Sequence, residues 1–559
     1  MLKYLYMRGN DIMERKISVN YDGKDIAVPY KSKVLDILKS LNINDNKILG
    51  FRINNEIKNY EYEIVANSII EPIYFNSEDG YRIYSRTLKM VLYMALQRLY
   101  SEADVEFMTT INKDQYFVIN NIELNAEKVE KIKDMMTKII EKDYPITKRL
   151  VSMEEATELY KASNNTDKLT NLENKLRSYV SMYFCDSSYN SFYGALAAST
   201  GAVKDFDLIK YRDGALLVIP DENQNIKKEI KDNRLYDTFI DCNKFNQVLD
   251  VENVGNLNDK VLKNKIGKVI QASEAIHQRK LVELVQDIEK RREIKMILIA
   301  GPSSSGKTTF AQKLGVQLNL IGYNPITISM DNYFKERVDT PLGPDGKYDF
   351  ECVEALDIEL FNTQMKDLID GKQVELPRFD FVNGVKQYKG DYLKMEKNDI
   401  LIIEGIHALN PILTTFTPDH NKYKIYIAPI ATLNIDGYTK VSSTDTRLLR
   451  RMVRDYATRG NGVEKTFDLW KNVKKGEEKY IFPFVDTVDF VYNSSLVYEP
   501  GVIKTFAQPL LLQVEKSSKF YSEARRLYEY LNNFLPIETS NIPVDSIIRE
   551  FIGNGCFYR

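Results

Sequence analysis

Residues 296–310 read MILIAGPSSSGKTTF, and this stretch decides the fold of the second half of the chain. An apolar run ends at Ala300, and small residues follow it up to Gly306 and Lys307. The pattern GxxxxGK[ST], which starts at Gly301, is typical of a loop that holds phosphate groups between a strand and a helix. Apolar residues recur at helical spacing after the loop, at Phe310, Leu314 and Leu318. A strand, a phosphate-binding loop and a helix are therefore predicted in this order.

The composition of the loop suits this chemistry. Gly301 and Gly306 permit backbone conformations and close approaches that a Cβ atom would obstruct. Successive backbone N–H groups and the helix N-terminus then form a concave anion site. We expect Lys307 to reach the β- and γ-phosphates of a nucleotide and Thr308 to bind Mg²⁺ through its hydroxyl. The residues expected to hold the nucleotide are Gly301, Ser303, Ser304, Ser305, Gly306, Lys307, Thr308 and Thr309.

A plain glycine-rich turn with a surface lysine is the alternative reading of this stretch. The strand before it and the helix after it favour a nucleoside triphosphate site instead. The NKxD motif by which GTPases read guanine is absent after Thr308. We therefore expect ATP as the phosphate donor, with another nucleoside triphosphate as the alternative.

Strand-like and helix-like segments alternate from residue 294 onward. The candidate buried strands are 295–300, 325–329, 399–405, 424–429 and 488–496. Such alternation predicts a parallel β-sheet covered by helices, an α/β fold.

The bulk composition limits the possible functions. At 559 residues the chain is too long for one core, and about three or four domains are expected. Lysine and arginine number 77 against 79 aspartate and glutamate residues, so no overall field attracts nucleic acid. Four separated cysteines indicate reduced thiols rather than a disulfide framework. No run approaches the ~18 apolar residues of a membrane helix, and a cytosolic protein without a membrane partner is expected.

Two acidic residues follow predicted strands. Asp331 lies just beyond strand 325–329, and Glu404 ends strand 399–405. The carboxyl ends of parallel strands form the edge of the sheet where ligands bind. A carboxylate there serves as base or orients an acceptor hydroxyl, and another holds Mg²⁺. A helix cap or surface position is the alternative for Asp331.

An arginine-rich helix is predicted over residues 444–459. Arg447, Arg450, Arg451 and Arg454 cluster on one side of it, and Arg459 follows. A solvated helix face is the ordinary explanation. With a phosphate loop in the same domain, we favour a lid that closes over the triphosphate.

These segments together resemble the uridine kinase and phosphoribulokinase family of P-loop kinases. The resemblance covers residues 294 to about 500 and rests on GPSSSGKTT, ISMDNYF, YDFECVEALD, LPRFDF, LIIEGIHAL, DTRLLRRMVRDYATRG and NSSLVYE, in that order. It implies phosphorylation of a nucleoside 5′-hydroxyl by ATP with Mg²⁺, most simply of uridine to UMP.

The resemblance also implies roles for single residues. Asp331 matches the catalytic base, Glu404 the carboxylate of the magnesium site, and Asp349 the acid that holds the ribose hydroxyls. Phe379 matches an aromatic residue beside the base, and Arg451 an arginine near the nucleoside. The residues that match the lid are Arg450, Arg454 and Arg459.

Some positions depart from the family pattern. Gly384 stands at or near the place of the histidine that reads the pyrimidine in uridine–cytidine kinases. Tyr333 and Phe334 reverse the family's order of two aromatic residues, and Asn461 replaces an arginine. A site discriminates strongly through hydrogen bonds only when those groups are present. A different nucleoside or a sugar phosphate is therefore the alternative acceptor.

The first 245 residues resemble the N-terminal part of threonyl-tRNA synthetase. The resemblance rests on DGYRIYSRTLKMVLYMALQRLY (79–100) and FYGALAASTGAVKDFDLIKYRDGALLV (192–218). It implies a β-grasp module of the TGS type followed by an α+β domain of the editing type. The four ligand positions of that domain correspond to Arg86, Met90, Phe192 and Leu196, which neither bind a metal nor activate water.

The expected domains follow from these patterns. They are a TGS-like module (14–77), an editing-like domain without its ligands (78–245), a helical linker (246–292), a kinase domain (293–500) and a C-terminal helical tail (501–559). The polar stretch 164–175 is expected to be a surface loop. A nucleotide-switched RNA-binding or regulatory protein is a further alternative, with a weak tRNA contact by the N-terminal half, and a homo-oligomer is possible in principle.

Overall fold

The five predicted strands around the phosphate loop form one parallel sheet. Its order is β14-β17-β13-β18-β21, with the strand before the loop in the middle. The bounds are β13 (Met296–Ala300), β14 (Asn324–Ser329), β17 (Asp399–Glu404), β18 (Lys422–Ala428) and β21 (Phe490–Asn493). Every residue of β13 is buried, which agrees with a parallel sheet covered on both faces. This part of the α/β prediction is confirmed.

The computed structural model describes most of the chain. The described residues are 15–557 without 112–113, 174–177, 222–224, 227–233, 292, 344–345, 347 and 381–382. The boundary predicted at residue 14 lies outside them. Among the described residues, no helix is both long and apolar enough to cross a membrane.

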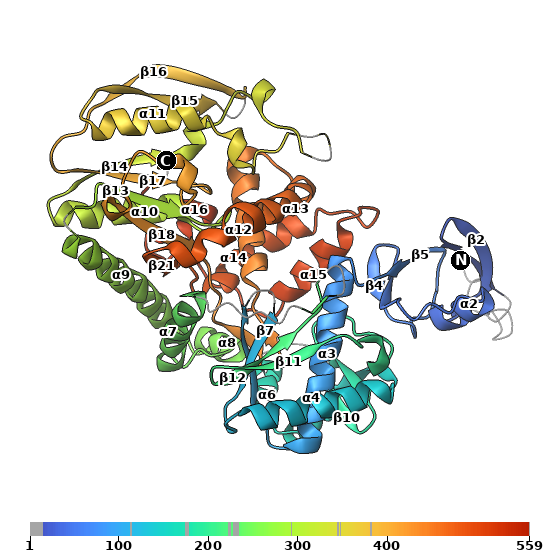
Figure 1. Cartoon of the computed structure of the whole chain (residues 1–559). Coiled ribbons are helices and arrows are strands. Elements are labelled where there is room, and N and C mark those ends of the chain that lie inside the picture. Colours follow the sequence, from blue (N-terminus) through green and yellow to red (C-terminus); the bar gives the residue numbers. More distant parts are fainter. Residues whose placement is uncertain are drawn as a thin grey trace.

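Helices cover the sheet on both sides (Figure 1). On one face, α10 (Lys307–Leu320) and α9 (Ile266–Lys290) share an apolar core with β13 and β17. Leu314, Leu318 and Phe310 of α10 are fully buried there, as their spacing predicts. α9 follows α8 (Val254–Leu262) in the stretch expected to be a helical linker. Because α9 buries one of its faces against the sheet, it is a layer of the α/β unit rather than a free connection.

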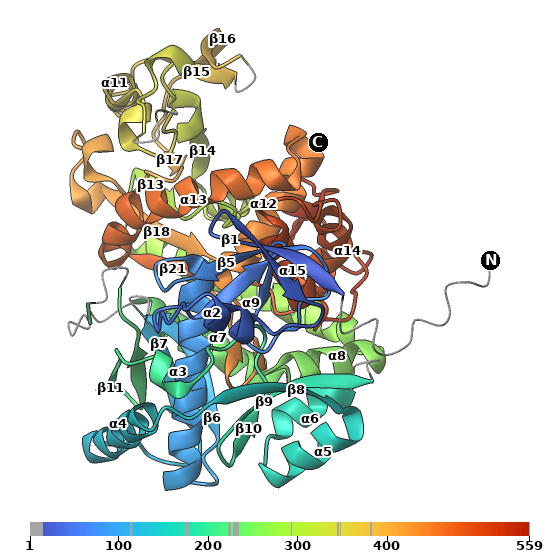
Figure 2. The same cartoon turned by 90° about the vertical axis from the view of Figure 1, so that its right-hand side faces the viewer.

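The opposite face of the sheet carries the elements that follow β14. They include α11 (Ile358–Ile369) and the antiparallel pair β15 (Val374–Asp380) and β16 (Val385–Leu393). Figure 2 places this group at the end of the molecule farthest from α5 and α6. Further along the chain lie α12 (Ser443–Arg459), α13 (Val463–Tyr480), α14 (Glu499–Leu511), α15 (Tyr521–Leu531) and α16 (Arg549–Ile552).

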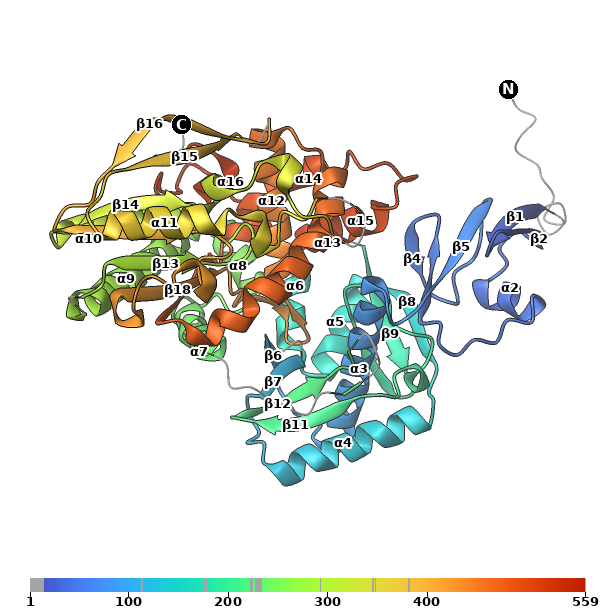
Figure 3. The same ribbon diagram turned by 45° about the horizontal axis from the view of Figure 1, so that its top comes forward.

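A small sheet at the start of the described chain has the order β2-β1-β5-β3-β4. Its elements are β1 (Lys16–Tyr21), β2 (Lys24–Pro29), α2 (Val34–Ser40), β3 (Gly50–Ile53), β4 (Glu56–Lys58) and β5 (Ser68–Ile73). Asp22 and Gly23 join β1 to β2 with φ angles of 50° and 77°, the positive values that a tight hairpin turn needs. Figure 3 shows this unit to one side of the rest, attached through the long helix α3.

The middle region combines two antiparallel sheets with helices. Its elements are α3 (Glu78–Leu99), β6 (Val105–Ile111), β7 (Asp114–Ile119), α4 (Ala126–Glu141), β8 (Ile146–Ser152), α5 (Met153–Ala162), α6 (Thr166–Glu173), β9 (Tyr179–Cys185), β10 (Ser188–Asn190), β11 (Asp207–Tyr211), β12 (Gly214–Val218) and α7 (Arg234–Val248). The prediction of a surface loop over 164–175 is wrong for residues 166–173, where α6 forms. Its polar residues Lys168 and Asn171 are buried because they contact another part of the chain.

That other part is the short hairpin of β19 (Asn434–Asp436) and β20 (Thr439–Lys440), which comes just before α12. The side chain of Asp167 accepts a bond from Gly437 N (2.6 Å), and Lys89 Nζ donates to Tyr438 O (2.9 Å). The Tyr438 ring is 6% exposed. It lies 5.5 Å from the ring of Tyr93, centroid to centroid. A hairpin from the second half of the chain is thus built into the core of the first half.

We expect Tyr438→Ala to destabilise this junction strongly. Removing a buried aromatic side chain leaves a cavity and costs about 3–5 kcal/mol. Urea unfolding followed by circular dichroism measures the loss. Tyr388→Ala is the matched control, since Tyr388 on β16 is 50% exposed and its truncation should change stability by no more than ~0.5 kcal/mol. Equal losses in the two variants would contradict the hairpin as a joint.

Candidate active site

The phosphate loop has the geometry that its glycines predict. Gly306 has a φ of 88°, and α10 begins at the next residue. A Cβ atom added at Gly301 would lie 2.0 Å from the carbonyl oxygen of Ile427, on the neighbouring strand β18. Only glycine allows this approach of loop and strand. The N–H groups at the start of α10 therefore face the site.

Lys307 is held by the loop itself. Its Nζ donates to the carbonyl oxygens of Gly301 (2.9 Å) and Pro302 (3.2 Å). Burial lowers the pKa of Lys307 below its ordinary value, while the charges of Glu404 and Asp331 act in the opposite direction. The ammonium group thus lies between the loop and the two acidic residues predicted for the site.

Asp331 and Glu404 meet at the carboxyl edge of the sheet. Ser329 of β14 pairs with Glu404 of β17, and Asp331 follows two residues after Ser329. Burial raises the pKa of Glu404 to about 7, and the negative charge of Asp331 adds to this effect. Asp331 is exposed to solvent, but the protein atoms around it desolvate its carboxylate and raise its pKa, whereas Lys307, Arg459 and Arg454 lower it. The structure brings together the two carboxylates and the lysine that the sequence singled out.

A buried carboxylate organises three of the predicted arginines. Asp455 is fully buried and accepts from Arg451 Nε (3.2 Å) and Arg454 NH2 (2.9 Å). Arg459 NH1 lies 3.5 Å from the same carboxylate, with a side chain 52% exposed. Arg451 also donates to the Ser303 hydroxyl of the loop (3.0 Å). These arginines line the site; the i,i+4 spacing of Asp455 from Arg451 and Arg459 was the sequence signal for these pairs, whereas its burial was not readable.

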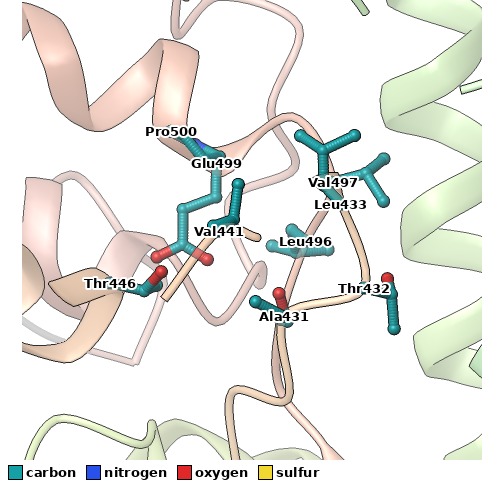
Figure 4. A pocket seen from close by; sticks show the side chains of 10 residues that line it. Ala431, Thr432, Leu433, Val441, Thr446, Leu496, Val497, Glu499 and Pro500 are labelled. Atoms are coloured by element: carbon teal, nitrogen blue, oxygen red, sulfur yellow. The ribbon is translucent and has the colours of Figure 1, made fainter. Parts of the chain in front are cut away.

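Arg450 differs from the expected lid residue. It is 0% exposed, and its guanidinium makes a two-point ion pair with Glu499, with NH2 2.6 Å from Oε2. Its NH1 donates to the carbonyl oxygen of Ser304 (3.3 Å). Glu499 borders a cavity of about 10 Å³ (Figure 4), too small for a nucleotide or an acceptor. Arg450 therefore supports the loop from behind, because Glu499 takes up its charge inside the protein.

Glu477 of α13 is a second support that the sequence did not reveal. Both of its carboxylate oxygens accept from NH2 of Arg447, at 2.9 and 2.6 Å. Its Oε1 also accepts from Ser303 N (3.0 Å). The backbone of the phosphate loop is thus fastened to α12 and α13 by buried charged groups.

Asp349 and Glu351, two positions apart in one motif, have different surroundings. Asp349 uses Oδ1 to accept from the backbone N–H of Glu351 (3.0 Å) in a local turn. The pKa of Glu351 is raised to about 7. Burial is the main cause; the charge of Arg451 acts in the opposite direction, and the charges of Glu477, Asp331 and Asp349 add to the effect of burial. The electrostatic partners of Glu351 are therefore residues of the site. Sequence reasoning chose Asp349, two positions away in the same motif.

Phe379 lies in an aromatic group near this edge. Its ring centroid is 5.8 Å from that of Phe334, which is 6.3 Å from Phe350. Tyr333, by contrast, points into the core and donates to Gln364 Oε1 (2.8 Å). A Cβ atom at Gly384 would lie 2.8 Å from Cβ and Nε of Arg337. Arg337 therefore fills the space that a side chain at position 384 would use.

The oxygen donors at this edge suit Mg²⁺ bound together with a triphosphate. Among the described residues, no group of three or more histidine, cysteine or acidic side chains forms a metal site. Thr308 and Glu404 supply a hydroxyl and a carboxylate, and Mg²⁺ usually takes one or two protein ligands plus phosphate and water oxygens. The buried Glu404 carboxylate, which burial and Asp331 hold near a pKa of 7, gains a counter-charge when such an ion binds.

The N-terminal positions aligned with synthetase ligands form an apolar group. Met90, Phe192 and Leu196 are buried in one core together with Tyr438 of the hairpin. Arg86 donates from Nε to the carbonyl oxygen of Ala195 (3.0 Å). Tyr438, from the second half of the chain, thus packs against the apolar side chains at these positions. The synthetase resemblance itself stays a prediction.

Known proteins resemble the second half of the chain. A family model described as Phosphoribulokinase / Uridine kinase family matches residues 296–496. The uridine kinase of Macrococcus caseolyticus is 33% identical over 178 residues, which make up 32% of this chain and 77% of that protein. The uridine kinase of Staphylococcus haemolyticus is 31% identical over 181 residues, with shares of 32% and 77%. The chain belongs to the phosphoribulokinase/uridine kinase family.

Membership in the phosphoribulokinase/uridine kinase family settles the class of reaction. The protein is an ATP-dependent phosphotransferase that acts on an alcohol group. A solved structure described as a possible uridine kinase from Bacillus stearothermophilus is 18% identical, with a TM-score of 0.25, over 36% of this chain and 89% of that one. Residues before 296 lie outside the family match.

We expect Arg450→Met to lower the free energy of unfolding. Removing one partner of a buried ion pair leaves the other charge uncompensated and costs about 3–5 kcal/mol. Chemical unfolding measures the change, and the double variant Arg450→Met/Glu499→Leu should regain much of the loss. Arg459→Gln, at a half-exposed site, should leave stability within ~0.5 kcal/mol and lower phosphotransfer. An Arg450→Met protein with unchanged stability would contradict the supporting role.

Proposed function

We propose that this protein is a nucleoside kinase that transfers the γ-phosphate of ATP to a 5′-hydroxyl, with uridine as the first candidate acceptor. The observation that carries the proposal is the meeting of Lys307, Asp331 and Glu404 at one edge of the sheet, beside the phosphate loop. The uridine kinases among the family's relatives support the choice of acceptor.

Catalysis would rest on positioning and on neutralising charge. Lys307 moves from the loop carbonyl oxygens to the phosphates, where its charge offsets the charge of the transferring group. Arg454 and Arg459, held near Asp331 by Asp455, face the same region. Asp331 orients or deprotonates the acceptor hydroxyl. Mg²⁺, when bound at Thr308 and Glu404, supplies charge neutralisation at the phosphate oxygens.

Glu351 would hold the hydroxyl groups of the acceptor in place of Asp349. Its carboxylate shares the site with Arg451 and Asp331, whereas the Asp349 carboxylate is used in a turn. An ionised carboxylate offers both oxygens as acceptors to a pair of hydroxyls, whereas a protonated one uses one of its oxygens as a donor. Acceptor binding should therefore depend on the ionisation of Glu351.

A second candidate is the same transfer to a different acceptor. The observation that favours it is Gly384, which offers no side chain for reading a base and which is covered by Arg337. An arginine presents donors only, so it favours an acceptor that carries oxygen acceptors or negative charge. A panel of nucleosides, sugars and sugar phosphates, each incubated with ATP and the purified protein, separates the two candidates. Selective turnover of a sugar phosphate would overturn the nucleoside assignment.

We expect Asp331→Asn to abolish turnover and leave ATP binding nearly intact. Loss of a general base lowers the rate about 10²–10⁴-fold, whereas the loop residues that hold ATP are unchanged. Coupled-enzyme kinetics measures turnover, and calorimetry with an ATP analogue measures binding. Turnover within tenfold of the unsubstituted protein would contradict the role of Asp331.

The kcat/KM for the acceptor should also vary with pH. Glu351, with a pKa of about 7 in the free protein, is mostly protonated at pH 6 and mostly ionised at pH 8. The acceptor kcat/KM, measured at saturating ATP and Mg²⁺ because Glu404 also has a pKa of about 7, should therefore rise about tenfold between these pH values. Glu351→Gln should remove this rise and weaken acceptor binding at pH 8. If Asp349→Asn removes the rise and Glu351→Gln does not, the assignment is wrong.

A further inference from the structure

The C-terminal segment lies directly on the phosphate loop. A Cβ atom added at Gly306 would lie 2.5 Å from Cγ2 of Ile547. Ile547 and Phe551 are buried in the same core as α10 and β13. The Arg450 guanidinium carbon lies 4.9 Å from the centre of the Phe551 ring. Residues 542–552 are therefore part of the wall around the nucleotide site, although they are far from the loop in the sequence.

This segment places an acidic side chain on the loop. Glu550 Oε2 accepts from the backbone N–H of Thr309 (3.2 Å) and from its hydroxyl (2.8 Å). The charge of Glu550 also acts on Lys307, whose pKa is lowered mainly by burial. Glu550 is thus a negatively charged group seated at the first turn of α10.

Thr309 N–H belongs to the donors that a nucleotide needs. The first N–H groups of a helix have no partner within the helix, and in GxxxxGK[ST] loops they cradle the α- and β-phosphates. One N–H group cannot serve a carboxylate and a phosphate oxygen at full strength together. A phosphate oxygen bound to this N–H group would have to replace the Glu550 oxygen, whose charge repels the phosphate as well.

The backbone around Glu550 is held in place by hydrogen bonds, whereas the long Glu550 side chain can rotate. Lys313 Nζ donates to Asp545 Oδ2 (2.8 Å), which ties the segment to α10. Arg549 NH2 donates to the carbonyl oxygens of Thr539 and Ile542, both at 2.8 Å. Rotation of the Glu550 side chain alone therefore breaks its two bonds to Thr309, and the packed segment stays in place.

We infer that Glu550 competes with the nucleotide for the start of α10, so that the C-terminal segment restrains nucleotide binding. The phosphates must displace the Glu550 carboxylate to reach Thr309. Nucleotide affinity is accordingly lower than the loop alone would give. This inference concerns the nucleotide site only and does not depend on which acceptor the protein phosphorylates.

Glu550→Gln tests the inference because it removes the charge and keeps the shape. We expect the Kd of ADP and of a non-hydrolysable ATP analogue, both with Mg²⁺, to fall about tenfold, since a hydrogen bond to a charged group is lost from the competing state. Isothermal titration calorimetry without acceptor gives these values. Glu538→Gln is the matched control, because Glu538 is an exposed acid of the same tail and its loss should leave the Kd unchanged.

Adenosine, which has no phosphate, separates competition from a general change of the pocket. Its Kd should be the same in Glu550→Gln and in the unsubstituted protein. Nucleotide affinity that is unchanged or weaker in Glu550→Gln overturns the inference, and so does an equal gain for adenosine. Thermal melting of each variant confirms that the comparison is made on folded protein. Failure of the proposed kinase reaction would show instead in the acceptor panel, with these binding values unaffected.

Discussion

The free N–H groups of the phosphate loop are the constraint on which the rest of this structure depends. Gly301 and Gly306 bring the loop so close to β18 and to the C-terminal segment that no Cβ atom fits at either position. The exposed donors then require negative partners. Glu477 and Glu550 provide them at Ser303 and Thr309. Both acids come from elements that follow the loop by well over a hundred residues.

Buried charge is used here in two different ways. Arg447 and Arg450 are neutralised by Glu477 and Glu499, and these two pairs fasten the loop to the helices around it. Arg454 and Arg459 share Asp455 and keep part of their surface open to the site. The same arginine-rich helix thus has a supporting side and a side that faces the phosphates. The difference follows from which acid lies nearby, since the Arg450 guanidinium uses Nε, NH1 and NH2 inside the protein and has little left to offer a ligand.

The two halves of the chain are joined at a hairpin. Tyr438 lies in the core of the first half, and α12 begins a few residues later. Lys89, Asp167 and Asn171 hold the hairpin backbone from the other side. This contact explains why α6 formed where a polar surface loop was predicted. Its polar residues satisfy a partner that is distant in the sequence, which no local pattern can reveal.

The sequence by itself determined the parallel sheet, the phosphate loop and the family of the second half. These depend on local patterns: buried apolar strands, glycines at fixed spacing, and acids at strand ends. Lys307, Asp331 and Glu404 could be named in advance for that reason. Only the tertiary structure decided that Arg450 is buried against Glu499, that Asp349 accepts from the backbone of Glu351, and that Glu550 lies on the loop. Those facts depend on which side chains meet across long separations, and spacing along the chain carries no record of such meetings.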